Sequence, residues 1–344
     1  MDGEKRVLLG MTLEELQDLA LRAGMPRFVG KQIAEWIYAR RVDDFEQMFN
    51  ISKKNRAWLS EHCEIGRQRP SDCQVSSDGT RKYLFRIGGG RAVESVYIPE
   101  HDRATLCVSS QCGCKMNCYF CATGRMGFKS NLTAAQILNQ ILSIPPKEEE
   151  HRMNALTNVV FMGMGEPLDN WREVRRAIDV LVAPWGLAWS PKRITVSTVG
   201  KLPELKNLLD ETEVHVAVSV HTADMKERES MMPAQKAFPL KDVVNILKGY
   251  DFSRQRRLSA EYIMWKGVND DMDHARMLER LLQGLHCRVN LIRFHAIPGV
   301  DLKPCSEERM IMFRNYLNSK GITATIRTSR GEDIMAACGM LAKG

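Results

Sequence analysis

The sequence lacks any long apolar run. No stretch of about 18 uninterrupted apolar residues occurs in its 344 residues, so a membrane-spanning helix is not expected. The first six residues, Met1 to Arg6, contain no apolar core of the kind that a signal peptide needs. No internal repeat and no low-complexity tract is visible. We therefore expect a cytoplasmic protein that does not bind a membrane.

The composition is that of a globular protein with a modest basic excess. Apolar residues make up 44% and charged residues 26%, which predicts one large domain and a smaller one. The formal charge is +7, with 49 basic and 42 acidic residues, and this permits a polyanionic partner without proving one. Any single basic cluster is ordinarily a solvated surface, but their number in the first ninety residues favours RNA binding. The clusters are Arg40 with Arg41, Lys53 with Lys54 and Arg56, Arg67 with Arg69, Arg81 with Lys82, and later Arg254 with Arg256 and Arg257.

Residues 11 to 60 have the pattern of a small helical domain. Thr12 and Glu15 form a capping box before an apolar stripe, and Gly24 is a plausible end of that helix. A second helix carries Ile33 and Trp36 on one side, and a third is predicted over 55–62. Such a domain is too small for a large active site but suits a polyanion. Residues 81 to 98 then alternate, which predicts a pair of strands.

After Thr105 the chain alternates short β-rich runs with helical stretches. This order predicts a parallel sheet of about six strand-helix units, with functional residues at the carboxyl ends of the strands. The expected strands are 158–162, 193–198, 214–220, 259–264 and 288–294, and the expected helices are 133–142, 171–181, 240–247, 273–282 and 306–319.

Ten cysteines in a reducing compartment are more readily thiols or metal ligands than disulfides. Five of them lie between Cys107 and Cys121, and three have the spacing Cys114-x3-Cys118-x2-Cys121. Three thiolates can hold three irons of a four-iron cluster and leave the fourth iron open to a substrate or cofactor. The cysteines at 63, 73, 287 and 305 are most simply ordinary thiols.

Small residues surround this tripod of cysteines, as a loop that wraps a bulky cluster requires. Gly113 and Gly124 flank it, and Tyr119 and Phe120 could shield the iron from water. A zinc site that also uses Cys112 is the alternative. Zinc motifs usually pair two short hooks separated by a longer span, which is not the spacing found here.

The segment Cys107-Val-Ser-Ser-Gln-Cys-Gly-Cys-Lys-Met-Asn-Cys-Tyr-Phe-Cys-Ala-Thr-Gly resembles the radical S-adenosylmethionine (SAM) enzymes, and specifically the RlmN/Cfr family of RNA adenine methyltransferases. The resemblance extends from the helical N-terminal part to Ala336-Ala337-Cys338-Gly339. It implies an α/β fold: a partial (β/α)6 TIM-like barrel with a small helical domain. The expected divisions are 1–75 (helical, RNA-binding), 76–99 (strand-pair linker) and 100–344 (radical SAM core with a catalytic tail).

The resemblance also implies the chemistry. Carbons 2 and 8 of adenine are electron-poor, so they cannot attack a sulfonium methyl group directly. The family uses a four-iron, four-sulfur (4Fe-4S) cluster, held here by Cys114, Cys118 and Cys121, and two SAM molecules per turnover. One methylates a thiol, and the other yields a 5′-deoxyadenosyl radical that activates the methyl group. The cofactor performs the difficult step, and the protein positions it.

Three catalytic residues follow from the match. The methylated cysteine corresponds to Cys338, and Cys107 would resolve the covalent RNA adduct by forming a disulfide with it, which requires an accessible thiolate. Glu94 matches the proton acceptor. Its place on the apolar face of an alternating segment alone leaves two interpretations open, an acid/base of raised pKa or a residue at an exposed edge.

The resemblance assigns the SAM contacts to predicted strand ends. Gly165 and Glu166 follow the first strand of the core after the cysteines, where glycine lets the backbone approach and the carboxylate accepts from the ammonium group. A glycine-rich turn alone would be weak evidence. Many relatives carry asparagine at the position of His295. The full set of expected SAM contacts is Gly165, Glu166, Ser197, Ser219, Val220, His221 and His295.

Two products are open within the family. Glu166-Pro167-Leu168 and the helical domain resemble the carbon 2 enzymes, whereas the segments 111–114 and 121–124 also occur in carbon 8 enzymes. Carbon 2 is favoured. A zinc or iron-sulfur RNA-binding module without catalysis is the alternative of another class. The implied partners are 23S ribosomal RNA, transfer RNA and an electron donor such as flavodoxin or ferredoxin, with the chain expected to be a monomer.

Overall fold

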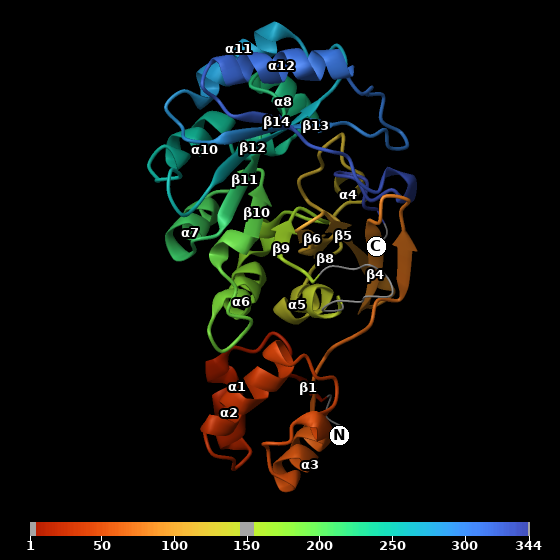
Figure 1. Cartoon of the computed structure of the whole chain (residues 1–344), viewed down its shortest axis with the longest axis vertical. Coiled ribbons are helices and arrows are strands. Elements are labelled where there is room, and N and C mark those ends of the chain that lie inside the picture. The colour runs from red at the N-terminus through yellow and green to blue at the C-terminus, as the bar shows by residue number, and fades with distance from the viewer. Residues whose placement is uncertain (1–4, 145–154, 343–344) are drawn as a thin grey trace.

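The computed structural model describes residues 5–144 and 155–342. Met1 to Glu4, most of the segment used to judge the absence of a signal peptide, lie outside these residues. Figure 1 shows a helical unit below a large sheet that is flanked by further helices. Within the described residues, no helix is both long enough and apolar enough to cross a membrane.

The helical unit begins as its capping signals predict. Helix α1 (Leu13–Arg22) starts after Thr12. The Thr12 hydroxyl accepts from the Glu15 amide, and the Glu15 carboxylate accepts from the Thr12 amide. The helix ends before Gly24, which has φ of 70°. Helix α2 (Phe28–Ala34) continues through a wider turn over residues 35–39, and α3 (Lys53–His62) follows. The predicted helices of this unit are confirmed.

Ten strands of the described residues form one sheet, in the order β14-β13-β12-β11-β10-β9-β6-β5-β4-β3. From β6 to β14 all neighbours are parallel, and β3, β4 and β5 add an antiparallel edge. The five strands expected after residue 158 are confirmed within one or two residues. The bounds are β3 (Asp72–Val75), β4 (Arg81–Gly88), β5 (Arg91–Pro99), β6 (Ala104–Cys107), β9 (Asn158–Phe161), β10 (Ile194–Thr198), β11 (His215–Ser219), β12 (Leu258–Met264), β13 (Arg288–Arg293) and β14 (Ala324–Ile326).

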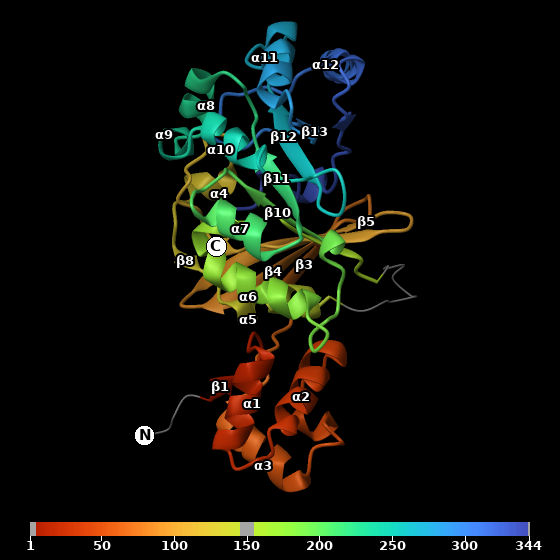
Figure 2. The same ribbon diagram turned by 90° about the vertical axis from the view of Figure 1, so that its left-hand side faces the viewer.

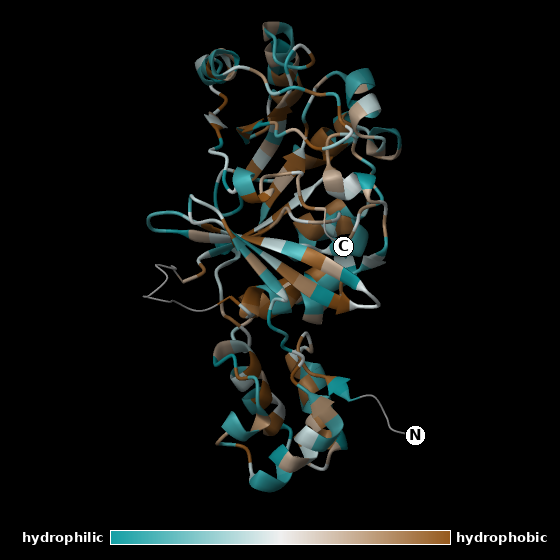
Figure 3. Ribbon diagram, turned by 90° about the vertical axis from the view of Figure 1, so that its right-hand side faces the viewer, coloured by the Kyte–Doolittle hydropathy of each residue, from teal (hydrophilic) through white to brown (hydrophobic). Residues whose placement is uncertain are grey.

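Helices cover the outer face of the parallel strands, as Figure 2 shows from the side. The apolar side chains concentrate on the strands and on the helix faces that meet them, while the outer helix surfaces are hydrophilic (Figure 3). The right-handed strand-helix alternation places the carboxyl ends of all the parallel strands at one end of the barrel. The helices of this layer are α4 (Ala122–Arg125), α5 (Ala134–Leu142), α6 (Trp171–Val182), α7 (Glu204–Glu211), α8 (Met225–Met231), α9 (Ala234–Ala237), α10 (Leu240–Leu247), α11 (Met272–Leu282) and α12 (Glu307–Ser319).

The segment 76–99 belongs to the sheet. Its strands β4 and β5 were expected as a pair, and β5 pairs in addition with β6 of the core, while β3 extends the edge. Two short pairs of strands went unpredicted because two residues carry no periodic signal. They are β1 (Arg6–Val7) with β2 (Cys63–Glu64), and β7 (Gln111–Cys112) with β8 (Ser130–Asn131).

Several arginines of the basic clusters hold the helical unit together and attach it to the core. Arg56 is 8% exposed and pairs with Glu46 at 3.4 Å. Arg67 donates to the carbonyls of Arg41 and Leu142, which joins the two units. Arg56 and Arg67 are therefore structural, and the exposed Lys53 and Lys54 remain as surface charge.

Candidate active site

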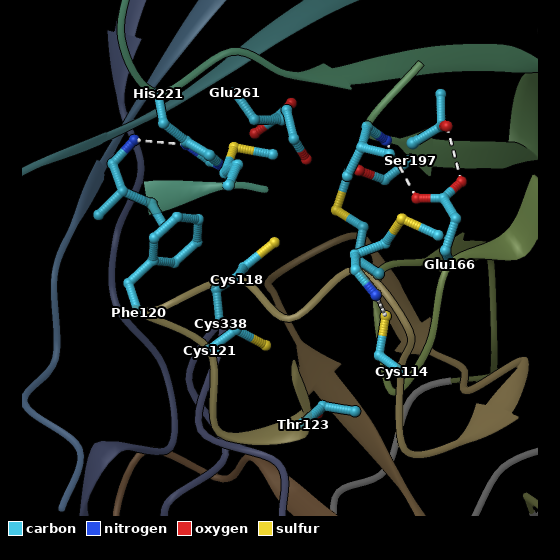
Figure 4. A pocket seen from close by; sticks show the side chains of 18 of the residues that line it. Cys114, Cys118, Phe120, Cys121, Thr123, Glu166, Ser197, His221, Glu261 and Cys338 are labelled. Carbon is cyan, nitrogen blue, oxygen red and sulfur yellow. Dashed lines mark hydrogen bonds between the residues drawn. The ribbon is translucent and has the colours of Figure 1, made fainter. Parts of the chain in front are cut away.

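One cavity, of about 150 Å³, lies at the carboxyl ends of the parallel strands. Cys114, Cys118 and Cys121 line it from one loop, and Cys338 lines it from the C-terminal tail. Figure 4 shows these four thiols facing the same space as Glu166 and His221. The fold therefore brings together residues from opposite ends of the core sequence, in the place where a barrel of this kind binds its ligands.

The loop that carries the tripod is fixed at both ends. The short pair β7 and β8 closes it, and a Cβ on Gly113 would lie 1.8 Å from the Gly127 carbonyl oxygen, so only glycine fits there. The Tyr119 amide donates to the Met231 carbonyl at 2.9 Å. Phe120 lines the cavity and is 6% exposed, as expected of a residue that shields a cluster.

The tripod has the chemistry of a site for a cationic cluster. Burial raises the pKa of Cys114 to about 12, and burial followed by the charges of the other two cysteines raises the pKa of Cys118 well above its ordinary value. Three thiolates cannot coexist here unless positive metal charge offsets them. Across residues 5–144 and 155–342, no group of three cysteine, histidine or carboxylate side chains is placed to hold a single metal ion.

Cys112 does not complete a zinc site with the tripod. Its side chain is buried outside the cavity, and its thiol donates to the Ala92 carbonyl at 3.5 Å. The four-cysteine zinc alternative therefore lacks its fourth ligand.

Glu166 lies across the cavity from the thiols. Its Oε1 accepts from the Thr198 hydroxyl at 2.6 Å, and its Oε2 accepts from the Val199 amide at 3.0 Å. Burial raises the pKa of Glu166 to about 7, and these hydrogen bonds lower it in part. The residue is therefore a fixed acceptor whose charge changes near neutral pH.

Gly165 makes this placement of Glu166 possible. Its φ is 95°, and a Cβ there would lie 2.4 Å from Cβ of Gln111. The close approach lets Gln111 Oε1 accept from the Glu166 amide at 2.9 Å. The turn therefore connects β9 with the cysteine loop.

The remaining expected SAM contacts divide between two places. Ser197, Ser219 and His221 line the cavity, whereas Val220 is buried between the latter two and does not line it. Burial, and then the charge of Arg228, lowers the pKa of His221 to about 3, so its imidazole is neutral. Its Nδ1 accepts from the Ile263 amide at 3.1 Å.

His295 does not lie in the cysteine-lined cavity. It lines a second, adjoining cavity, where its Nε2 is 3.0 Å from the Ser329 hydroxyl and its Nδ1 contacts Glu332. A contact between His295 and SAM would need a ligand that reaches into this second cavity.

Arg228 was not predicted from the sequence, yet it connects two strand ends of the site. Its guanidinium donates to the Ser219 carbonyl at 2.9 Å, to the Val220 carbonyl at 3.2 Å and to Gln235 Oε1 at 2.6 Å. The side chain is 0% exposed, and burial lowers its pKa to about 10 while the nearby Cys118 raises it. An arginine in a short polar helix gives no pattern from which this role could be inferred.

Cys338 is exposed and held between anchored segments of the tail. Asp333 accepts from the Ser76 hydroxyl at 2.6 Å on one side, and the Ala122 amide donates to the Gly339 carbonyl at 2.8 Å on the other. Cys107 ends β6, beside Val96 and Val160 of its neighbour strands. Burial and then the charge of Cys338 raise the pKa of Cys107 to about 12.

Glu94 is buried and paired rather than exposed at an edge. It is 2% exposed, its Oε1 lies 3.2 Å from Nζ of Lys82, and its Oε2 accepts from the Ala342 amide at 3.0 Å. Glu94 does not line the cysteine cavity, but it contacts the tail four residues after Cys338. The structure thus places Glu94 in the protein interior beside the tail, and its catalytic role stays a prediction.

Two family models match the chain. Residues 7–65 match the ribosomal RNA large subunit methyltransferase N-terminal domain, and residues 108–278 match the radical SAM superfamily. A protein of Parabacteroides distasonis named probable dual-specificity RNA methyltransferase RlmN is 56% identical over 98% of this chain and 97% of its own length.

A more distant relative also matches nearly the whole chain. The dual-specificity RNA methyltransferase RlmN of Dinoroseobacter shibae is 41% identical over 99% of this chain and 90% of its own. The chain belongs to the RlmN family. A crystal structure of a radical SAM methyltransferase from Sphaerobacter thermophilus superposes on this RlmN-family chain with a TM-score of 0.91 and 37% identity, covering 98% of this chain and 99% of the other.

Membership of the RlmN family confirms the expected radical SAM barrel with its helical N-terminal unit. It also confirms the expected cofactors, a 4Fe-4S cluster and SAM, for which the tripod and the adjoining cavity have suitable donors. The assignment of individual residues to catalysis and SAM binding stays a prediction.

Proposed function

We propose that this protein is a radical SAM methyltransferase that methylates carbon 2 of one adenine in the peptidyl-transferase region of 23S ribosomal RNA and of the adenine beside the anticodon in transfer RNAs. The observation that carries the proposal is that Cys338 lines the same cavity as the three tripod cysteines. A thiol so placed can receive a methyl group from SAM and present it to a base. The relatives named as dual-specificity methyltransferases support both RNA substrates.

The residues of the chain have separate tasks in this scheme. Cys114, Cys118 and Cys121 would hold the cluster, which would supply the electron for cleavage of SAM. The residues that would position SAM lie at the strand ends, and the Glu166 carboxylate would accept from its ammonium group. They are Gly165, Glu166, Ser197, Ser219, Val220 and His221, with His295 extending the set towards the second cavity. Cys338 carries the methyl group, Cys107 releases the product by forming a disulfide with Cys338, and Glu94 accepts the proton lost from the ring.

Glu94 needs a change in its surroundings to do this. Lys82 and the Ala342 amide occupy its carboxylate in the present arrangement. A shift of the tail would free one oxygen of the carboxylate from the Ala342 amide and leave it able to accept a proton. The tail is therefore proposed to move between methyl loading and RNA turnover.

We infer the following wider organisation. Residues 1–75 help to bind RNA, residues 76–99 extend the sheet, and residues 100–344 form the catalytic core and its tail. A flavodoxin or ferredoxin delivers the electron, and the protein acts as a monomer in the cytoplasm. The exposed Lys53 and Lys54 at the start of α3 are the best-placed charges of the first part.

Nucleoside analysis of ribosomal and transfer RNA from a deletion strain tests the proposal. We expect 2-methyladenosine to disappear and to return when the gene is restored. Loss of 8-methyladenosine instead would assign the carbon 8 reaction. Protein that is colourless after anaerobic reconstitution and binds one zinc, rather than about four irons per chain, would favour a non-catalytic module.

A further inference from the structure

A second cavity, of about 490 Å³, extends from the active site through the barrel interior. It shares Met162, Glu261, Ile292, Arg327 and Cys338 with the cysteine-lined cavity. Cys338 therefore faces two spaces, one with the cluster ligands and one that leads to the opposite end of the barrel. Apart from His295 and Cys338, none of the residues given a task above lines this second space.

The interior of this barrel is polar where most barrels are apolar. Branched apolar side chains normally fill the centre of a parallel barrel. Here the inward positions near the amino ends of the strands line the cavity with hydrogen-bonding groups. They are Asn158, Thr195, Ser259, Asn290 and Thr325.

Two buried acceptors in this interior lack a hydrogen-bond partner among the described residues. They are Oγ1 of Thr105 and Oε2 of Glu261, although Glu261 also lies 3.6 Å from Arg327. Thr105 is 8% exposed and Glu261 is 4% exposed. Buried polar atoms without partners indicate that a polar ligand or water completes the site.

The amino-terminal rim of the cavity is basic. Lys192 lies in a 3-10 turn (Pro191–Arg193) directly before β10, Arg257 directly precedes β12, and Arg288 is the first residue of β13. All three line the cavity and are exposed, and none of them forms an ion pair with another described residue. Over the whole lining, six lysines and arginines face two carboxylates.

The charges of the three rim residues all affect the same side chain, that of His215. His215, the first residue of β11, has a lowered pKa, caused first by burial and then by the charges of Arg257, Lys192, Arg256 and Arg288. Arg256 differs from the rim residues because it is buried and donates to the Leu209 carbonyl at 2.8 Å. The rim thus gathers three exposed basic side chains and His215 around the lining of one cavity.

We propose that Lys192, Arg257 and Arg288 bind the backbone phosphates of the RNA strand on either side of the target adenine, and that this adenine reaches Cys338 through the second cavity. This inference rests on the proposed function. It adds the route by which the adenine reaches Cys338 and the residues that contact the RNA phosphates. Ile292, which lines both cavities, lies four positions after Arg288 along β13. The distance from the rim to the point where the cavities meet is therefore on the order of 13 Å. A nucleotide turned out of its stack can enter such a space, while a paired base cannot.

The test is the salt dependence of RNA binding. Each phosphate contact to a single strand contributes about 0.7 to the slope of log affinity against log salt. The triple variant Lys192→Gln, Arg257→Gln and Arg288→Gln should therefore lower the slope for a transcript of the peptidyl-transferase region by about 2. At 0.1 M salt its affinity should fall on the order of 100-fold by the same relation.

Two further triple variants make the result specific. Lys206→Gln, Lys241→Gln and Lys248→Gln remove the same charge from exposed positions outside both cavities, and should change RNA affinity less than threefold. Lys192→Arg, Arg257→Lys and Arg288→Lys keep the charge and should retain the slope. Two results would overturn the proposal. One is an unchanged salt slope in the triple variant of Lys192, Arg257 and Arg288, and the other is an equal loss of RNA affinity in the triple variant of Lys206, Lys241 and Lys248.

Methylation of Cys338 separates this inference from the proposed function. Mass spectrometry should find the Cys338 methyl group equally in the rim variant and in wild type, because loading of the thiol needs no RNA. If the wild-type protein methylates no RNA, the proposed function fails. The salt slope of RNA binding still tests the rim in that case.

Discussion

The two ends of the barrel differ in the chemical character of the side chains that line them. At the carboxyl end, buried thiols and Glu166 line the cavity, and burial raises the pKa of each. At the amino end, exposed lysine and arginine side chains surround polar strand residues. One end suits a metal cluster and a cofactor held away from water, and the other suits a solvated polyanion. Cys338 lies where the two spaces meet.

Of all the variants, Cys338→Ala should have the largest effect on RNA methylation. It removes the group that connects the two cavities, so RNA methylation should fall below detection, a loss of at least about 1000-fold for a covalent carrier. The tripod is untouched, and iron content and cluster absorbance should match wild type. RNA methylation that persists in this variant would remove Cys338 from its proposed role.

Arg228→Met should damage the carboxyl end alone. The substitution removes the arginine donor from the carbonyls of Val199 and Ser219, and each group left unpaired costs about 1–3 kcal/mol, whereas the Val220 carbonyl keeps the Thr222 amide as donor at 2.7 Å. We expect a fall of at least about 2 kcal/mol in the free energy of unfolding by urea titration. Lower iron content after reconstitution should accompany it.

Arg228→Lys serves as the control, since it keeps the charge near Cys118 while losing most of the hydrogen bonds. It should lose nearly as much stability as Arg228→Met but retain more iron. Equal iron content in the two variants would show that the charge itself has no effect on the cluster.

Binding of SAM should depend on pH through Glu166. The pKa of this carboxyl group is raised to about 7, so below that pH it is largely protonated and lacks the negative charge that attracts an ammonium group. SAM affinity of the reconstituted protein should therefore rise from pH 6 to pH 7 by somewhat less than the limiting tenfold per unit, and level off above pH 7.5. Anaerobic calorimetry would measure this change.

Glu166→Gln should weaken SAM binding at pH 8 and remove its rise with pH. Gln keeps the acceptor oxygen for Thr198 but has no proton to lose. A pH profile that is the same in the variant and in wild type would assign the titration to another group.

Charge reversal at Lys53 and Lys54 should have the smallest effect. Both lie on the helical unit, away from either end of the barrel, so we expect the Michaelis constant for RNA to rise about threefold to tenfold by the loss of one or two phosphate contacts. Cleavage of SAM should stay the same. A larger effect than that of the rim variant would make the helical unit the main RNA-binding surface.

Arg56 is left out of that variant. The sequence groups it with the two lysines, but in the structure it is buried and paired with Glu46. Arg56→Glu would place a carboxylate beside Glu46 and destabilise the unit, which the thermal midpoint would report. Unchanged thermal stability would contradict this assignment.

Features set by neighbouring residues were predictable from the sequence. The capping boxes at Thr12 and Thr133 mark the starts of α1 and α5, and apolar runs mark β9 to β13. The spacing of the tripod indicates the cluster, because three ligands on one loop need no information about the rest of the fold. The family resemblance then identified the tail cysteine.

Features that depend on strand pairing were not predictable. Nothing local says that Lys82 faces Glu94, since that contact depends on the register of β4 against β5 and on the path of the tail. Likewise Arg254, Arg256 and Arg257 look equivalent in the sequence. In the structure Arg254 pairs with Asp251, Arg256 is buried, and Arg257 faces the second cavity. Periodicity alone does not sort three arginines so close together.

The position of the tail has a consequence for biosynthesis. Cys338 follows every strand of the sheet in the chain, and its anchors are the β3–β4 turn and the cysteine loop, both of which are translated much earlier. Domains fold as they leave the ribosome, amino-terminal parts first. The cysteine loop and every strand of the sheet are therefore synthesised before the segment around Cys338. Iron and sulfur could reach the loop while this end of the barrel is still uncovered, before that segment packs against it.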